Sequence, residues 1–433
     1  MTVSDGRRSR APARPHSAAA AGSVNRTTAV AVDRIASAAQ AFSVAEYLAA
    51  DFASGAAARD RGRILPHQEV ERLAASGLLA ITVPAQYGGA DLPPSAVAEV
   101  VRLLAVADPN IAQIPHSHFV YLNLVRLAGS AAQRERYFGQ VLAGARIANA
   151  QSERGGATVA DISTTLRPVG DRFRVDGRKF YCTGSLFANL LAVLTTLDDV
   201  AGRSGLEPGE YIVYLPADTP GVRIVDDWNG IGQRTTGSGT VSLEDVVVER
   251  DQLIRRSAAV HAPTGYGAFA QLLHVAIDAG IARGALSAAT EFVRTTSRPW
   301  FEAGVARAID DPLLIQRFGE LSVAVTAAEA TLGAAGEAVD RATNIERGDA
   351  AELAARASLA VAAAKVLADR AANDVSSALF EVSGTRSAAA DLNLHHFWRN
   401  ARTHTLHDPI RWKYQHIGRA LLHGTAPPLH GVI

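Results

Sequence analysis

Histidine and arginine side chains are concentrated between residues 380 and 414. The stretch contains four histidines and four arginines: His395, His396, His404, His407, Arg386, Arg399, Arg402 and Arg411. Imidazole titrates near neutral pH and guanidinium binds phosphate, so this composition predicts an anionic ligand beside an acid–base or hydrogen-bonding group. A solvated, charged helix accounts for the same residues equally well.

Two polar segments in the middle of the chain are the other candidates for a site. They are NAQSERGGA (149–157) and KFYCTG (179–184). Hydroxyl and amide groups held on rigid strands can bind the edge of a flat heterocycle, and a threonine hydroxyl can donate to a ring nitrogen. Taken singly, a turn and an ordinary strand explain these segments as well.

Other chemistry is poorly supported by the motifs. The glycine-rich segment GIGQRTTGSG (230–239) matches neither phosphate-loop template, and we interpret it as a mobile loop of a β domain. No His/Glu pair with metal-ligand spacing lies on a convincing helix face, so we predict no metal site. The Gly-x-Ser-x-Gly signature of many hydrolases is absent from the sequence.

Composition limits the class of protein. The chain has 433 residues, of which 48% are apolar and 20% charged, with a formal net charge of zero. These values predict a globular protein with a large core and no nucleic-acid partner. No uninterrupted apolar run approaches the roughly 18 residues of a membrane span, and no apolar signal core begins the chain. We therefore expect a cytoplasmic protein without a membrane partner.

Sulfur is scarce in this sequence. Cys182 is the only cysteine and Met1 the only methionine. A single cysteine excludes an intrachain disulfide, and a chain of this length ordinarily uses several methionines as core filler. Synthesis during sulfur shortage would favour such a composition, although compositional drift in an Ala- and Arg-rich genome explains it equally well.

The apolar periodicity changes twice along the chain. Residues 1–26 are poor in large apolar side chains and are predicted to be disordered. Residues 27–148 have helical periodicity, residues 149–260 alternate with a period of two, and residues 261–433 are helical again. Within the middle domain, Asp176-Gly177 is predicted to be the turn of a hairpin. The expected fold is α+β, with an N-terminal helical domain, a β-barrel-like middle domain and a C-terminal four-helix bundle.

This order, together with several motifs, resembles the acyl-CoA dehydrogenase family over nearly the whole chain beyond residue 26. The motifs are NAQSE before a glycine pair, GRKFYCTG, WNGIGQRTTGSGTVSLEDVVV and FWRNAR. The resemblance implies a flavin between the β domain and the helical bundle, with a neighbouring subunit of a homotetramer completing the site. It further implies that Ser152 lies at the pyrimidine side of the flavin and Thr183 near N5. The residues implied at the flavin phosphate, across subunits, are Arg298, Ser383, Gly384 and Arg386.

One departure from the family favours a particular branch. Dehydrogenases of this fold use a carboxylate base, often a glutamate in a Tyr-Glu-Gly-Thr segment, but here the sequence is Thr405-Leu406-His407-Asp408-Pro409. RTHTLHDP, SGTRS and TSRPW resemble the flavin-dependent monooxygenase branch, which includes dibenzothiophene monooxygenase and sulfur-acquisition oxidoreductases. That branch implies reduced FMN supplied by a separate NAD(P)H:flavin reductase, with Asn149, Thr183, His407 and His118 lining the reactive face.

The resulting hypothesis is oxygenation of a small organosulfur compound, such as a sulfone, sulfoxide or thioether. Reduced flavin adds O2 at C4a, and the (hydro)peroxide survives only where water is excluded and its oxygens are hydrogen-bonded. His407 and Asn149 would supply such bonds. Two alternatives remain: an FAD-dependent acyl-CoA dehydrogenase with Asp408 as a displaced base, and a catalytically inactive binding protein.

Overall fold

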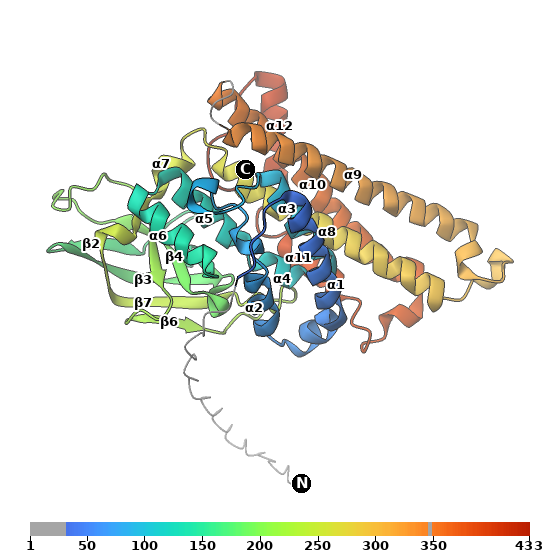
Figure 1. The fold of residues 1–433 in the computed structure, drawn as a ribbon. Coiled ribbons are helices and arrows are strands. Elements are labelled where there is room, and N and C mark those ends of the chain that lie inside the picture. The colour runs from blue at the N-terminus through green and yellow to red at the C-terminus, as the bar shows by residue number, and fades with distance from the viewer. Residues whose placement is uncertain (1–31, 345–348) are drawn as a thin grey trace, which may run out of the picture. The chain divides into compact units, whose positions relative to one another are not determined.

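The computed structural model describes residues 32–344 and 349–433. Six helices precede the sheet (Figure 1): α1 (Ala38–Gly62), α2 (His67–Ala75), α3 (Pro94–Ala107), α4 (Pro109–Gln113), α5 (His116–Ala128) and α6 (Ala131–Leu142). Side-chain caps fix several of the helix starts. Ser130 and Gln133 form a capping box at α6, and Asp108 accepts from the Asn110 amide at the start of α4.

The middle of the chain forms one mixed sheet. Its strands are β1 (Ile147–Ala150), β2 (Thr165–Val169), β3 (Arg172–Cys182), β4 (Leu190–Leu197), β5 (Glu210–Pro216), β6 (Val222–Val225), β7 (Gly239–Val248) and β8 (Leu253–Arg255). The strand order is β6-β7-β3-β2-β4-β5-β8, and β1 pairs in parallel with β4. This pairing places β1 beside the segment that follows β3, where the two polar segments noted above meet.

Helices return after the sheet: α7 (Arg256–Val260), α8 (Tyr266–Thr295), α9 (Pro312–Thr343), α10 (Ala350–Ser383), α11 (His396–His404) and α12 (Ile410–His423). Figure 1 shows α8, α9 and α10 running side by side, with α3 against α8. Asp311 and Asp349 cap the starts of α9 and α10 by accepting backbone N–H bonds. The expected order of a helical domain, a β domain and a helical bundle is confirmed.

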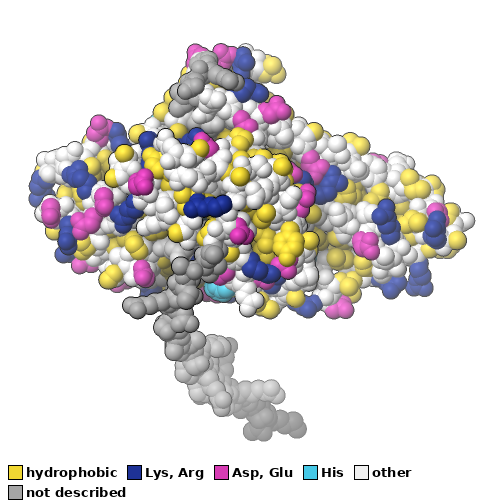
Figure 2. Space-filling model, in the orientation of Figure 1, with side chains coloured by type: hydrophobic (Ala, Val, Ile, Leu, Met, Phe, Trp, Pro, Cys, Tyr) yellow, Lys and Arg dark blue, Asp and Glu magenta, His cyan; other side chains and the backbone are white. Residues whose placement is uncertain are grey.

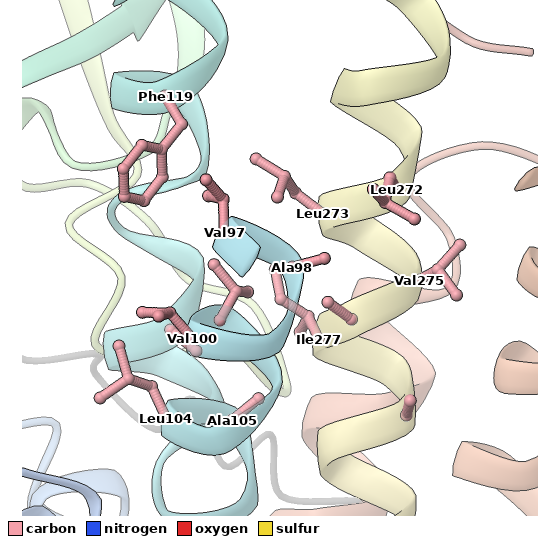
Figure 3. Packing of buried hydrophobic residues seen from close by; sticks show 14 of the residues in the cluster. Val97, Ala98, Val100, Leu104, Ala105, Phe119, Leu272, Leu273, Val275 and Ile277 are labelled. Atoms are coloured by element: carbon pink, nitrogen blue, oxygen red, sulfur yellow. The ribbon is translucent and has the colours of Figure 1, made fainter. Parts of the chain in front are cut away.

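Helix α8 is the centre of the hydrophobic core. In Figure 3, Val97 and Ala98 of α3 face Leu273 and Ile277 of α8. Gly280 permits the close approach of the two helices, since a Cβ there would lie 2.6 Å from the Arg102 carbonyl oxygen of α3. By length and composition α8 could cross a membrane, contrary to the sequence-based expectation, but 83% of its most apolar window is buried in the protein. A helix that is apolar on all sides is expected at the centre of such a bundle.

The predicted hairpin turn at Asp176-Gly177 is wrong. Both residues lie inside β3, at a shift in its register with β7, and the turn into β3 is made by Gly170 with a φ of 63°. Glycine is required at position 177 for a different reason: a Cβ there would lie 2.2 Å from the Thr164 hydroxyl. An Asp-Gly pair marks a bulge as readily as a turn.

The glycine-rich segment 230–239 is packed rather than mobile. The backbone N–H of Gln233 donates to Asn400 Oδ1 of α11 at 2.7 Å, and Gln233 and Thr235 are buried. A Cβ on Gly232 would lie 1.9 Å from the Arg399 carbonyl oxygen, so the backbone of the loop lies directly on α11. The loop therefore joins the β domain to the helix that carries the late histidines.

Charge on the surface is mixed. On the face that Figure 2 shows, Lys and Arg side chains of the described residues are interspersed with Asp and Glu side chains. This distribution agrees with the zero net charge of the sequence.

Candidate active site

Three imidazole rings are stacked where α5, α8 and the segment after α11 meet. The His274 ring lies between those of His116 and His407, with ring centroids 4.0 Å away on each side and interplanar angles of 32° and 37°. His274 is buried, whereas the His407 side chain is 44% exposed, so this end of the stack is open to a ligand. The Nε2–H of His116 donates to the Ala270 carbonyl oxygen at 2.9 Å, which fixes the third ring.

Asp408 contacts a lysine through one carboxylate oxygen and a histidine through the other. Its Oδ2 lies 2.7 Å from Lys413 Nζ, and its Oδ1 lies 3.3 Å from His407 Nδ1. Burial alone would raise the pKa of Asp408, but the His407 hydrogen bond, Lys365 and Lys413 lower it well below its usual value. A carboxylate with so low a pKa is a weak base, so the arrangement does not suit abstraction of a carbon-bound proton. Instead Asp408 orients His407 and leaves its Nε2 available.

Asn149 provides a second polar group near the stack. It lies on β1, and its Nδ2 donates to Ser117 Oγ at 3.0 Å, directly after His116 in the first turn of α5. Its buried Oδ1 has no hydrogen-bond partner among the described residues. A buried acceptor without a partner is costly unless a bound molecule or water satisfies it.

Thr183 is presented by an irregular end of β3. Tyr181 has a φ of 57°, a left-handed conformation that is uncommon for tyrosine, and the register with β7 shifts between Lys179 and Cys182. The turn places Thr183 Oγ1 2.8 Å from Ser238 Oγ. The following residue, Gly184, packs against the backbone of Ile114 and the side chain of Ala148, so Thr183 lies beside the start of β1 and the segment before α5.

One predicted residue, His118, is bonded to the backbone rather than free for a ligand. His118 is buried, its Nε2–H donates to the Leu79 carbonyl oxygen at 2.8 Å, and its Nδ1 accepts from the Ile147 amide at 3.1 Å. With both nitrogens bonded to the backbone, His118 joins α5 to β1 and has no atom left for a ligand. Ser152 is exposed and forms a single β-bridge with Phe180.

The residues predicted for the phosphate form a separate group. Arg386 donates to the Thr296 carbonyl oxygen at 2.8 Å, and Ser297 Oγ donates to the Ser383 carbonyl oxygen at 3.1 Å. Gly384 and Arg298 are exposed beside these contacts. The group lies at the far end of α8 from His274, about 30 Å away at 1.5 Å per helical residue.

Sequence patterns indicated some of this site and missed other parts. His407, Asn149 and Thr183 were predicted, whereas His274 and His116 were not. The usable signal for His274 was the spacing of His274 and Asp278, four residues apart on one helix.

Acid is expected to destabilise the protein well above the range in which carboxylates titrate. Burial lowers the pKa of His116 to about 3 and the pKa values of His118 and His396 to about 4. Below pH 6.5 these histidines become protonated in the unfolded chain but remain neutral in the folded protein. The free energy of unfolding therefore falls as the pH decreases from 6.5 towards 4. The loss should be about 2 kcal/mol per histidine between pH 7.5 and pH 5.

Urea midpoints measured across this range test the expectation. The variant His118→Gln, whose amide can both donate to Leu79 and accept from Ile147, should flatten the pH dependence. His261→Gln, at an exposed histidine, should leave it unchanged. Parallel curves for the wild type and His118→Gln would contradict the assignment of a neutral, buried His118.

Comparison with known proteins identifies the family. Family models described as "Acyl-CoA dehydrogenase, N-terminal domain" and "Acyl-CoA dehydrogenase, C-terminal domain" match residues 37–145 and 272–412. The chain is 34% identical to dibenzothiophene monooxygenase of Rhodococcus qingshengii over 396 residues, covering 89% of this chain and 93% of the relative. It is 31% identical to the probable FMNH2-dependent monooxygenase SfnC of Pseudomonas putida over 390 residues, covering 89% and 96%. The crystal structure of FMN-bound TdsC from Paenibacillus sp. A11-2 matches with a TM-score of 0.86 and 30% identity, covering 91% of this chain and 100% of that one.

The chain belongs to the acyl-CoA dehydrogenase family. Within that family it is a member of the flavin-dependent monooxygenase branch, as its similarity to three monooxygenases along almost their whole lengths shows. The resemblance inferred from the motifs is therefore confirmed.

Proposed function

We propose that this protein is a reduced-FMN-dependent monooxygenase that oxidises an organosulfur compound, with the reduced flavin delivered by a separate NAD(P)H:flavin reductase. The observation that carries the proposal is the site after α11, where an oriented and half-exposed imidazole, His407, stands beside a carboxylate already neutralised by Lys413. An imidazole whose Nε2 is free can hydrogen-bond a protonated, activated oxygen, whereas dehydrogenation needs a free carboxylate base.

The residues present suit a flavin at this position. The unpartnered Oδ1 of Asn149 is an acceptor for a ring N–H, and the Thr183 hydroxyl, shared with Ser238, can donate to a ring nitrogen. Bound reduced FMN would supply the two electrons that activate O2. Asn149 and Thr183 would hold the ring edge. His407 donates from Nδ1 to Asp408, so its Nε2 would accept a hydrogen bond from the reacting oxygen when that oxygen carries a proton.

The proposal extends to the oligomer. Arg298 and Arg386 are exposed cations that suit a phosphate, yet they lie about 30 Å along α8 from the stacked histidines. This separation exceeds what one FMN molecule can bridge. If both groups bind the same flavin, they come from different chains, and we propose a homotetramer in which such sites form between subunits.

An oxygenation assay tests the function. The protein is supplied with FMN, NADH, a flavin reductase and ¹⁸O2, and is offered a thioether, a sulfone and a sulfinate in turn. We expect one ¹⁸O atom in the product of at least one of them. Uncoupled hydrogen peroxide as the only product with every sulfur compound would count against the oxygenase. Anaerobic bleaching of a tightly bound flavin by an acyl-CoA would support the dehydrogenase alternative.

The sulfur-poor composition supports an organosulfur substrate. An enzyme that releases sulfur during sulfate limitation is made when cysteine and methionine are scarce, and this chain contains one of each. The name of the Rhodococcus relative places a thioether among the substrates of similar proteins. Neither observation depends on the geometry of the site, so both add independent weight.

A further inference from the structure

A second line of buried polar groups lies behind the three stacked rings. His274 Nδ1 lies 3.0 Å from His404 Nε2, His404 Nδ1 lies 2.5 Å from Asp278 Oδ1, and Asp278 Oδ2 lies 2.5 Å from Lys365 Nζ. All four side chains are almost completely buried. They come from α8, α10 and α11, so the line is created by the packing of three helices.

The Asp278 carboxylate determines which nitrogen of each histidine in this line carries the proton. Burial raises the pKa of Asp278, but Lys365 and His404 reverse the effect and lower it overall, so Asp278 is ionised and can only accept hydrogen bonds. His404 must therefore donate from Nδ1, which leaves its Nε2 as an acceptor. His274 must then donate from Nδ1, and its Nε2 carries a lone pair.

The Nε2 atom of His274 has no hydrogen-bond partner among the described residues. Within residues 32–344 and 349–433, no backbone or side-chain group forms a hydrogen bond with it. A buried imidazole whose tautomer is fixed on one side and whose other nitrogen is open has the arrangement of an oriented acid–base group.

We propose that His274 is the proton-carrying group of this site, and that His404 and Asp278 are positioning residues that keep its Nε2 free to accept and return a proton. The proposal rests on the oxygenase function. With reduced FMN bound as its monoanion and a thioether as substrate, the overall reaction is FMNH⁻ + O2 + thioether + H⁺ → FMN + sulfoxide + H2O. The O–O bond breaks and an S–O bond forms, O2 gains four electrons, and flavin and sulfur each lose two.

One proton must therefore enter per turnover, and it ends in the water molecule. His274 would deliver this proton from Nε2 and regain one from solvent at the open end of the stack. While it is protonated, its charge is shared with His404 and balanced by Asp278. The groups that face His274 are His116 on α5, Asp278 on its own helix, Lys365 on α10, His404 on α11, and His407 in the following segment.

The tautomer prediction can be tested without flavin or substrate. Magic-angle-spinning NMR of ¹⁵N-histidine-labelled protein at pH 7.5 should show His274 and His404 as neutral rings protonated at Nδ1, with His274→Phe identifying the first of these signals by its loss. Asp278→Asn offers an amide donor in place of the acceptor, and should convert both rings to the Nε2–H tautomer. A structural role alone would not reverse a tautomer.

His404→Gln serves as the second variant, because Asp278→Asn leaves Lys365 without its partner and could unfold the chain. Its amide can donate to Asp278 and accept from His274, so the His274 signal should stay Nδ1–H, although a glutamine cannot take up a further proton. An Nε2–H ring at His274 in the wild-type protein, or in His404→Gln, would overturn the proposal.

Coupled oxygenation provides the separate test of the proton step. We expect His274→Phe, which keeps an aromatic ring in the stack, to lower product formed per NADH by about 100-fold, the low end of the range for a positioned acid–base group. His404→Gln should shift the pH profile of product formation and retain part of the rate. Full coupling in His274→Phe would refute the proton role while leaving the oxygenase function intact. Correct tautomers without oxygenation of any sulfur compound would refute the function instead, and with it the proton step.

Discussion

His407→Ala is expected to lower the rate of coupled oxygenation by about 10² to 10⁴, the range for loss of one positioned catalytic group. The side chain is 44% exposed, forms a hydrogen bond with Asp408 and stacks on the ring of His274. Removing it should therefore leave the fold, the oligomer and FMN binding nearly unchanged. NADH consumption should continue, with the electrons appearing in hydrogen peroxide.

Product yield and peroxide must be measured together to test this expectation. His261→Ala, at an exposed histidine after α7, is the matched control and should retain the wild-type yield. A yield equal to the wild type in His407→Ala would remove this imidazole from the mechanism. A large loss of FMN affinity would instead indicate that His407 holds the cofactor.

Mixed oligomers of Arg386→Ala and His407→Ala are expected to regain activity that neither variant has alone. Each site would combine His407 and its neighbours from one chain with the phosphate-binding arginines of another, because the two groups lie about 30 Å apart within a chain. In a mixed pair, one site contains both wild-type groups and the other contains neither. Random pairing should restore about a quarter of wild-type activity, since half of the pairs are mixed and each has one intact site of two.

Co-expression of the two variants with different affinity tags allows the mixed species to be purified. The control is a mixture of the separately purified variants, assayed before any exchange of subunits. Activity no greater than the sum of the two parents would show that each flavin is held within one chain, or that Arg386 is not part of the site.

These expectations follow from the state of the one carboxylate that could act as a base in this fold. An acyl-CoA dehydrogenase needs an unpaired carboxylate, and the candidate here, Asp408, is neutralised by Lys413 and bonded to His407. The lowered pKa of Asp408 makes it a poor base but a good orienting group for an imidazole.

The sequence by itself determined the helix–sheet–helix order, the family and branch, the flavin, and the candidates His407, Asn149 and Thr183. These conclusions depend on local periodicity and on short motifs, which are properties of neighbouring residues. Local patterns also misled: Asp176-Gly177 has the composition of a turn, but the two residues lie at a register shift inside β3, where Thr164 packs against Gly177.

Only the tertiary structure decided which histidines act together. His274 and His404 are 130 residues apart, and they meet because α8 and α11 pack against each other. The same packing assigned His118 to the backbone of Leu79 and Ile147, and separated Arg298 and Arg386 from the stacked rings. Periodicity indicates which face of a helix is buried, but the partner of that face depends on how all the helices share one core.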